Sequence, residues 1–193
     1  MRAWVIAMES EAACVRPFLK AGDELVVSGV GKVNAAMAAQ RMIDAGADEI
    51  LNVGVVGGLD PSMDVGDVYE VSQAVEYDFD LAAVNGTRPG VLNERTTPYF
   101  DCRTVGAFPA RILATGDRFT DDESDQPLLA ELKATLRDME GAAIAHVCER
   151  AGVAFRSLKC VSDVRGKGAM TAQYRDNLER TLECLQRAVT SWM

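Results

Sequence analysis

Hydrophobic positions along this chain form short continuous runs that alternate with longer stretches in which apolar residues recur every three or four positions. Short apolar runs bounded by glycine or polar residues are typical of buried strands, whereas the wider spacing is typical of helices. The pattern predicts strands at 2–7, 24–28, 49–55, 67–77, 111–115, 136–139 and 154–162, and helices at about 9–20, 32–46, 125–134, 140–151 and 170–191. This alternation indicates an α/β fold with a central mixed, largely parallel sheet in a three-layer α/β/α arrangement.

The segment 78–109 interrupts the regular pattern with several glycines and prolines. Its apolar residues argue against disorder, and irregular stretches of this length in a compact fold are usually functional loops or interfaces. We therefore expect it to contact a partner such as a second copy of the chain. No repeat, linker or low-complexity block divides the sequence, so residues 1–193 are predicted to form a single domain.

Five of the predicted strands end in small, polar or acidic residues. These ends are Met8 to Glu11, Ser28 to Gly31, Gly57 with Gly58, Thr115 to Asp117, and Ser162 with Asp163. Ligands of open α/β sheets bind outside the carboxyl ends of the strands, and glycine lets the backbone approach a ligand closely. The five ends together predict a binding site for a small polar molecule.

Charge and composition narrow the class of protein. A formal net charge of −9 argues against a general binder of nucleic acid or anionic membranes, which needs clustered Lys and Arg, although acidity also serves solubility alone. Five scattered cysteines, expected as reduced thiols, and a single histidine do not provide a zinc site. No apolar run approaches the ~20 residues of a membrane span, and the first residues lack the pattern of a signal peptide, so the sequence predicts a cytoplasmic protein.

Three acidic residues stand where the sheet edge would present them, namely Glu11, Glu140 and Asp163. Each also has a structural interpretation, because the helix dipole favours a carboxylate in the first turn and an Asp after a strand can form an Asx turn or cap a helix. Three carboxylates directed at one cleft are harder to explain in that way, since like charges at close range repel and raise one another's pKa. They are the candidate acid and base groups.

Other catalytic motifs are incomplete. Val33 replaces the Ser or Thr that a P-loop requires, and the third glycine of a dinucleotide fingerprint is lacking after Gly31. ATP and NAD are therefore disfavoured. No GxSxG elbow is present, and His146, which lies between Ala145 and Val147, is interpreted as a structural rather than a catalytic histidine.

Five segments together resemble the 5'-methylthioadenosine/S-adenosylhomocysteine nucleosidases of the nucleoside phosphorylase superfamily. The segments are Ala7-Met8-Glu9-Ser10-Glu11, Ser28-Gly29-Val30-Gly31-Lys32-Val33, Asn52-Val53-Gly54-Val55-Val56-Gly57-Gly58-Leu59, Asp138-Met139-Glu140-Gly141-Ala142 with the helix that follows, and Val161-Ser162-Asp163-Val164. The resemblance extends over nearly the whole chain. It implies hydrolysis of the N-glycosidic bond of 5'-substituted adenosines in methionine salvage, without metal or organic cofactor, by a homodimer.

The resemblance also implies roles for single residues. Glu11 would be the base that activates water, and Asp163 would protonate the purine at N7 as it leaves. The implied substrate-binding residues are Met8 and Val30 at the 5' side of the sugar, Met139 and Glu140 at the ribose, Phe119 stacked on the purine, and Ser162 in support of Asp163. The backbone at Thr120 would read the purine edge.

The sequence departs from the family at two places. Val55 occupies a position that is commonly Ser in the superfamily, where it helps to hold phosphate in phosphorylases, and no arginine lies at the glycine-rich turns. Both features favour hydrolysis over phosphorolysis. The connection before Leu25 is shorter than in typical members, as if a hairpin were missing. The alternatives are another N-glycosidase or phosphorylase of the superfamily, such as a futalosine hydrolase, and a nucleoside-binding protein without catalysis.

Overall fold

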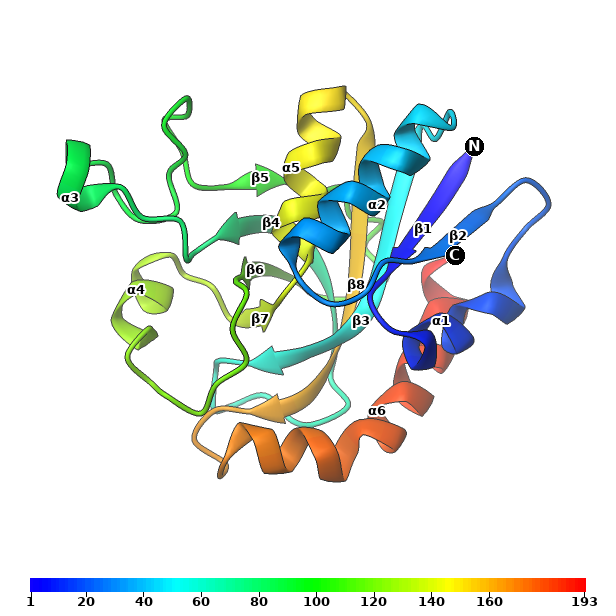
Figure 1. Ribbon diagram of the computed structural model, residues 1–193. Coiled ribbons are helices and arrows are strands. Elements are labelled where there is room, and N and C mark those ends of the chain that lie inside the picture. Colours follow the sequence, from blue (N-terminus) through cyan, green and yellow to red (C-terminus); the bar gives the residue numbers. More distant parts are fainter.

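The computed structural model describes residues 1–193 and shows a mixed β-sheet with helices packed on it (Figure 1). The strands are β1 (Arg2–Ile6), β2 (Glu24–Val27), β3 (Glu49–Gly58), β4 (Val68–Glu76), β5 (Phe100–Asp101), β6 (Ala110–Thr115), β7 (Leu136–Asp138) and β8 (Ala154–Val164). The helices are α1 (Glu9–Val15), the 3₁₀ helix η1 (Arg16–Phe18), α2 (Lys32–Asp44), α3 (Ala82–Asn85), α4 (Gln126–Glu131), α5 (Gly141–Ala151) and α6 (Met170–Trp192).

The strand order is β2-β1-β3-β7-β6-β4-β5, and β8 pairs with both β3 and β4. Strand β3 is parallel to β1 and β8, and β6 is parallel to β4 and β7. Three pairings are antiparallel, β3 with β7, β4 with β8, and β4 with the two-residue strand β5. Because β8 joins β3 to β4, the pairings from β3 through β7, β6, β4 and β8 lead back to β3. The predicted α/β class with a mixed sheet is confirmed.

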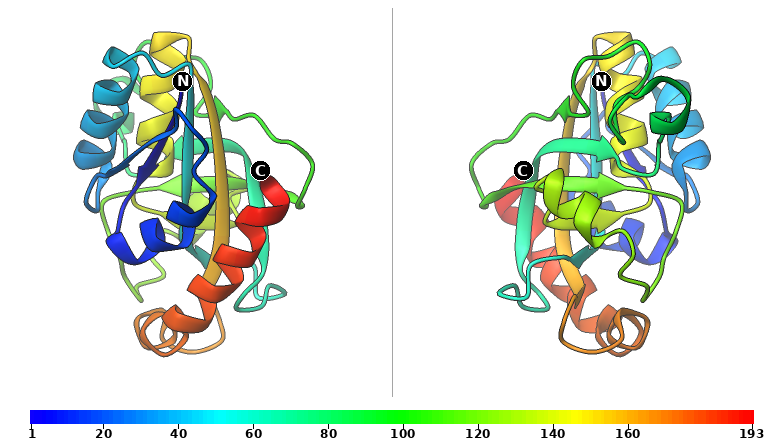
Figure 2. Two further views of the ribbon diagram at one scale, coloured as in Figure 1. Left: turned by 90° about the vertical axis from the view of Figure 1, so that its right-hand side faces the viewer. Right: turned by 90° about the vertical axis from the view of Figure 1, so that its left-hand side faces the viewer.

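Helices α2 and α5 lie apart from α1 and α6 (Figure 2), and each pair packs on an apolar cluster of its own. Helices α2 and α5 contribute mainly alanines, such as Ala39 and Ala142, whose small side chains allow close packing on the strands. Helices α1 and α6 pack on the second cluster, where Trp4 of β1 meets Trp192 of α6 edge to face with ring centroids 6.3 Å apart.

The structure differs from the predicted elements in three places. Helix α1 ends at Val15 and a 3₁₀ turn follows, because Pro17 has no N–H to continue the helical hydrogen bonds. Strand β3 runs on through Gly57 and Gly58, which pair with β7 and β8 instead of forming a turn. The segment 78–109, which extends at the upper left of Figure 1, contains the short helix α3 and the two-residue strand β5.

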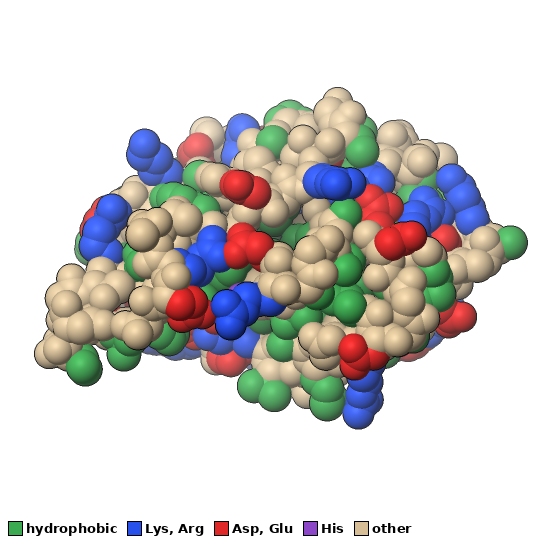
Figure 3. Space-filling view, turned by 90° about the horizontal axis from the view of Figure 1, so that it is seen from above, with side chains coloured by type: hydrophobic (Ala, Val, Ile, Leu, Met, Phe, Trp, Pro, Cys, Tyr) green, Lys and Arg blue, Asp and Glu red, His purple; other side chains and the backbone are tan.

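No helix is both long and apolar enough to cross a membrane. On the face shown in Figure 3, Lys and Arg side chains are interspersed with Asp and Glu, and no basic patch is visible. All five cysteines are free.

Candidate active site

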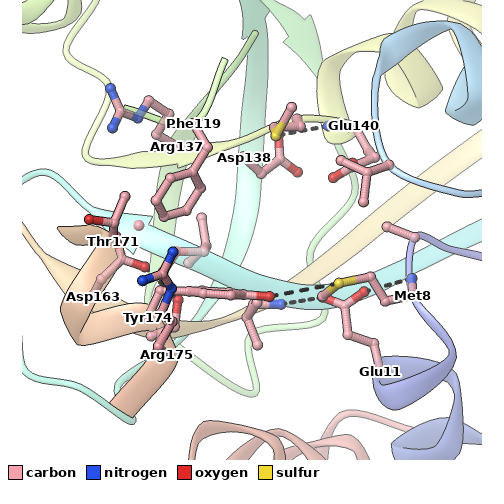
Figure 4. A pocket seen from close by; sticks show the side chains of 17 residues that line it. Met8, Glu11, Phe119, Arg137, Asp138, Glu140, Asp163, Thr171, Tyr174 and Arg175 are labelled. Carbon is pink, nitrogen blue, oxygen red and sulfur yellow. Dashed lines mark hydrogen bonds between the residues drawn. The ribbon is translucent and has the colours of Figure 1, made fainter. Parts of the chain in front are cut away.

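A cavity of about 330 Å³ lies beside the carboxyl ends of β1, β3 and β8, against the first turns of α6 (Figure 4). Small-molecule sites typically have this size. The eight residues whose side chains the sequence assigned to catalysis or substrate binding all line it, namely Met8, Glu11, Val30, Phe119, Met139, Glu140, Ser162 and Asp163. The expected convergence of strand ends was wrong for β6, because Thr115, Gly116 and Asp117 do not line the cavity.

Glu11 is held from two sides by backbone N–H groups. Val55 N–H donates to Oε1 (2.8 Å) and Met8 N–H donates to Oε2 (3.1 Å), and the side chain is only 3% exposed. A Cβ on Gly54 would lie 2.6 Å from Oε1, so the carboxylate approaches β3 this closely only because residue 54 is glycine. Burial raises the pKa of Glu11, although the two N–H groups and nearby Lys159 oppose this effect.

Glu140 lies at the junction of β7 and α5, and its Oε1 accepts a hydrogen bond from Gly31 N–H (2.8 Å) at the start of α2. Burial raises the pKa of Glu140 to about 7, and the neighbouring Asp138 adds to the increase while Lys159 opposes it. A neighbouring carboxylate thus raises a pKa at this end of the cavity, but the main one is Asp138, and of the three predicted carboxylates only Glu11 adds a smaller increase.

A buried ion pair below Glu140 was not found by sequence reasoning. Lys159 Nζ lies 2.8 Å from Asp138 Oδ2, and each side chain is 2% exposed. Asp138 also accepts hydrogen bonds from Thr115 Oγ1 (2.6 Å) and from Gly141 N–H (3.0 Å), which fixes the start of α5. A lysine in the middle of an apolar strand could have drawn attention to this pair, because a fully buried lysine requires an acidic partner.

Asp163 reaches the cavity through an irregularity in β8. Val56 of β3 pairs with Val161, but the next residue, Gly57, pairs with Asp163, so that Ser162 is an extra residue in β8. Such a bulge redirects the side chains that follow it. Val161 stays in the core, whereas Asp163 lines the cavity.

The Asp163 carboxyl has one satisfied and one free oxygen. Ser162 Oγ donates to Oδ1 (2.6 Å), while Oδ2 is buried without any hydrogen-bond partner. Burial raises the pKa of Asp163 to about 6, and the Ser162 hydroxyl and the positive charge of Arg137 both oppose the increase. The expected contribution of a neighbouring carboxylate is small here, since Asp121 is the weakest of these influences.

Aromatic and apolar side chains form the outer wall. Phe119 is 46% exposed and meets Tyr174 of α6 edge to face, with ring centroids 5.5 Å apart. Tyr174 OH lies 3.7 Å from Met8 Sδ, and Val30 stands at the rim, 45% exposed. A flat ring system would therefore find an aromatic surface at this wall.

Five further polar or aromatic residues line the cavity that sequence reasoning missed, namely Arg137, Asp138, Thr171, Tyr174 and Arg175. Tyr174 and Arg175 follow Thr171 by three and four residues at the start of α6, so both lie near Thr171 on the helix surface. That spacing, shortly after the Ser-Asp end of β8, is the sequence pattern that could have pointed to these residues of α6.

Two other residues lie outside the cavity. His146 Nδ1 is 2.9 Å from Glu76 Oε1, and its ring stacks on Phe100, which agrees with a structural histidine. Thr120, expected at the purine edge, does not line the cavity, and its carbonyl accepts a hydrogen bond from Arg137 Nη2 (2.9 Å).

Comparison with known proteins identifies the family. The family model of the phosphorylase superfamily matches residues 24–191. A 5'-methylthioadenosine/S-adenosylhomocysteine nucleosidase of Marinomonas sp. (strain MWYL1) is 33% identical over 160 residues, which cover 74% of this chain and 68% of the relative. An aminodeoxyfutalosine nucleosidase of Campylobacter jejuni is 32% identical over 159 residues, which cover 75% and 69% of the two chains.

A solved structure agrees with this assignment. The 5'-methylthioadenosine/S-adenosylhomocysteine nucleosidase from Colwellia psychrerythraea 34H in complex with adenine matches with a TM-score of 0.86 at 29% identity, and the match covers 100% of this chain and 94% of that chain. The chain thus belongs to the phosphorylase superfamily and, within it, to the family of the 5'-methylthioadenosine/S-adenosylhomocysteine nucleosidases.

Proposed function

We propose that this protein is a purine nucleosidase that hydrolyses the N-glycosidic bond of 5'-substituted adenosines, such as methylthioadenosine and S-adenosylhomocysteine, to adenine and a ribose derivative. The observation that carries the proposal is the pairing of two different carboxyl groups in one cavity. Glu11 is fixed by two backbone N–H groups, whereas Asp163 keeps one buried oxygen without a partner. A positioned base and an acid that retains its proton are the two groups that this hydrolysis needs.

The chemistry assigns a task to each group. Cleavage of the glycosidic bond develops positive charge on the sugar, as in glycoside hydrolysis. Glu11 would take a proton from the attacking water, and Glu140 would hold the ribose hydroxyls beside Met139. Asp163 would deliver its proton to N7, so that the purine leaves as a neutral base. The raised pKa of Asp163, about 6, keeps part of this group protonated near neutral pH.

Water is a better nucleophile for this site than phosphate. The N–H of Val55, which occupies the position that is commonly Ser in the superfamily, already donates to Glu11. A phosphate at this end would meet the buried carboxyls Glu11, Glu140 and Asp138, whose charge only Lys159 offsets. The two arginines that line the cavity, Arg137 and Arg175, come from β7 and α6, not from the glycine-rich turns. The acid-base set requires no cofactor.

The test is purine release from methylthioadenosine, S-adenosylhomocysteine and futalosine, each with and without phosphate. We expect release of adenine from methylthioadenosine and S-adenosylhomocysteine, at a rate that phosphate does not change. Release that depends on phosphate would show a phosphorylase, and release from futalosine alone would show the alternative substrate class. Saturable binding of adenosines without release from any substrate would favour a nucleoside-binding protein that has lost the chemistry.

Further properties belong to the same proposal. The protein would work in methionine salvage in the cytoplasm, as a homodimer in which segment 78–109 contacts the neighbouring subunit, and would bind no nucleic acid. Residues 1–193 would form a single domain with three α/β/α layers; α2 and α5 on one apolar cluster and α1 and α6 on the other support this arrangement. Sedimentation of the purified protein, alone and with substrate, tests the dimer.

A further inference from the structure

Arg137 is a buried cation in the wall of the cavity, and the proposed chemistry does not use it. Its side chain is 8% exposed, and Nη2 donates to the Thr120 carbonyl (2.9 Å) and contacts Met170 Sδ (3.8 Å). Nε and Nη1 have no partner in the protein, and neither atom is among the fully enclosed polar atoms of the chain. Donors that the protein leaves free beside a cavity are available to a ligand that accepts hydrogen bonds.

The register of the sheet places Arg137 at the same level as Asp163. Gly57 of β3 pairs with Arg137 on one side and with Asp163 on the other, and all three residues line the cavity. Neighbouring strands lie ~4.8 Å apart, so the two backbones flank Gly57 at a separation that a purine can bridge. The positive charge of Arg137 lowers the pKa of Asp163, as expected for two groups that line one cavity.

The geometry of a purine determines what Arg137 would meet. N7 and the substituent at C6 lie on the same edge of the ring, and the sugar is attached on the far side of the five-membered ring. A purine with N7 at Asp163 and its ribose at Glu11 and Glu140 therefore directs its 6-substituent along the purine end of the cavity, which Arg137 lines.

The chemistry of the two possible substituents is opposite. A guanidinium has only hydrogen-bond donors, and the 6-amino group of adenine also presents donors. The carbonyl oxygen of a 6-oxopurine accepts, and arginine facing the N7 and O6 edge is the commonest specific contact to guanine in nucleic-acid recognition. Any negative charge that a 6-oxopurine gains before N7 is protonated also spreads onto O6, where a fixed cation stabilises it.

We propose that Arg137 recognises the 6-position of the purine and that it extends the substrates of this site to 6-oxopurine nucleosides, the nucleosides of hypoxanthine and guanine. This inference rests on the proposed function, since it takes the orientation of the purine from the roles of Asp163 and Glu11. It adds a class of base that the proposed function does not include.

The test compares two substrates that differ only at the 6-position, methylthioadenosine and methylthioinosine. The kcat/KM of each is measured for the natural chain, for Arg137→Met and for Arg165→Met. Arg165 is the matched control, because it is also a buried arginine, 7% exposed, close to Glu123 but outside the cavity. Thermal unfolding of each variant shows whether it is folded.

We expect the natural chain to release hypoxanthine from methylthioinosine. Arg137→Met should lose about 10- to 100-fold in kcat/KM on methylthioinosine and only a few-fold on methylthioadenosine, as is typical of a lost hydrogen bond to a charged group. Arg165→Met should leave the ratio of the two substrates unchanged. Equal losses on both substrates in Arg137→Met, or activity of the natural chain on methylthioadenosine alone, would overturn the proposal. Inosine and guanosine, assayed in parallel, distinguish hypoxanthine from guanine.

Calorimetry of free bases separates this inference from the proposed function. If the natural chain hydrolyses neither substrate, the proposed function fails, but binding of hypoxanthine and adenine still tests Arg137. Binding of hypoxanthine that weakens at least tenfold in Arg137→Met supports its role at the 6-position. Binding of adenine alone contradicts that role.

Discussion

The two ends of the cavity both contain carboxyl groups with raised pKa, but the surroundings differ. At the sugar end, Glu11 and Glu140 accept hydrogen bonds from backbone N–H groups and share one buried cation, Lys159, with Asp138. At the purine end, Asp163 stands alone, with a single hydroxyl on one oxygen and nothing on the other.

The difference shows that a raised pKa has two sources with different chemical uses. Burial is the largest cause at both ends, but at Glu140 the repulsion from Asp138 adds to it, whereas at Asp163 the strongest neighbours lower the pKa. Crowded carboxylates are relieved when positive charge develops beside them, as it does on the sugar. A single dehydrated carboxyl is instead suited to hold a proton and to give it up.

Removal of the proton donor at the purine end should have the largest effect. Asp163→Asn keeps the shape of the side chain but has no acidic proton, so the kcat for adenine release should fall by about 10²–10⁴. Circular dichroism and thermal unfolding should show an intact fold. Asp122→Asn is the control, because Asp122 is exposed and pairs with Arg118 outside the cavity, and this variant should retain its activity. Near-normal turnover of Asp163→Asn would show that Asp163 is not the proton donor, and the contrast between the two ends of the cavity would then have no role in catalysis.

Loss of the ion pair at the sugar end should lower the stability of the fold. Lys159→Met leaves Asp138 as a buried charge without its cation, which typically costs about 3–5 kcal/mol in the free energy of unfolding. Urea unfolding measures this loss. The double variant Lys159→Met/Asp138→Asn removes both charges while the amide keeps Oδ1, which accepts from both Thr115 and Gly141, so it should recover more than half of the loss. A stability of Lys159→Met within about 1 kcal/mol of the natural chain would show that the ion pair is dispensable.

At the purine end, the titration of Asp163 should make the free energy of unfolding depend on pH. The pKa of Asp163 is about 6 in the folded chain and lies near 3.8 without the protein environment, so the folded state favours the protonated form. Its contribution to stability is complete below pH 4 and is lost as pH rises through 6. Asp163→Asn does not lose a proton, so at pH 8 it should exceed the natural chain by roughly 3 kcal/mol in the free energy of unfolding. At pH 4 this advantage should disappear. An advantage that is the same at both pH values would contradict the titration of Asp163.

The sequence predicted more of the carboxylates than of their environment. Glu11, Glu140 and Asp163 could be found because each occupies a strand end or a helix start, and such positions follow from local patterns in the sequence. Lys159 and Asp138 could not be paired in advance, because their contact depends on the alignment of β7 and β8 on either side of β3.

The fold shows the same division between local and non-local information. The order of helices and strands followed from hydrophobic periodicity, whereas the pairing of β8 with both β3 and β4 did not. The bulge at Ser162, which directs Asp163 into the cavity, is a matter of register with β3 and has no signature in the sequence of β8 alone. Arg137 and Asp163 are likewise brought to the same level of the sheet by Gly57, which lies between them and pairs with both.

The smallest predicted effect concerns the one hydrogen bond that Asp163 has. The Ser162 hydroxyl donates to Oδ1 (2.6 Å) and lowers the pKa of Asp163, so Ser162→Ala should raise this pKa from about 6 by up to about one unit. An acid is active while it is protonated, so the fall of kcat/KM at high pH should move to higher pH in this variant, with little change in the maximal rate. Val161→Ala is the control, since Val161 precedes Ser162 but stays in the core, and its profile should keep the natural position. If the pH profile of Ser162→Ala does not move, the fall of kcat/KM at high pH is not due to Asp163. The contrast between the two ends of the cavity would then be supported by stability measurements alone.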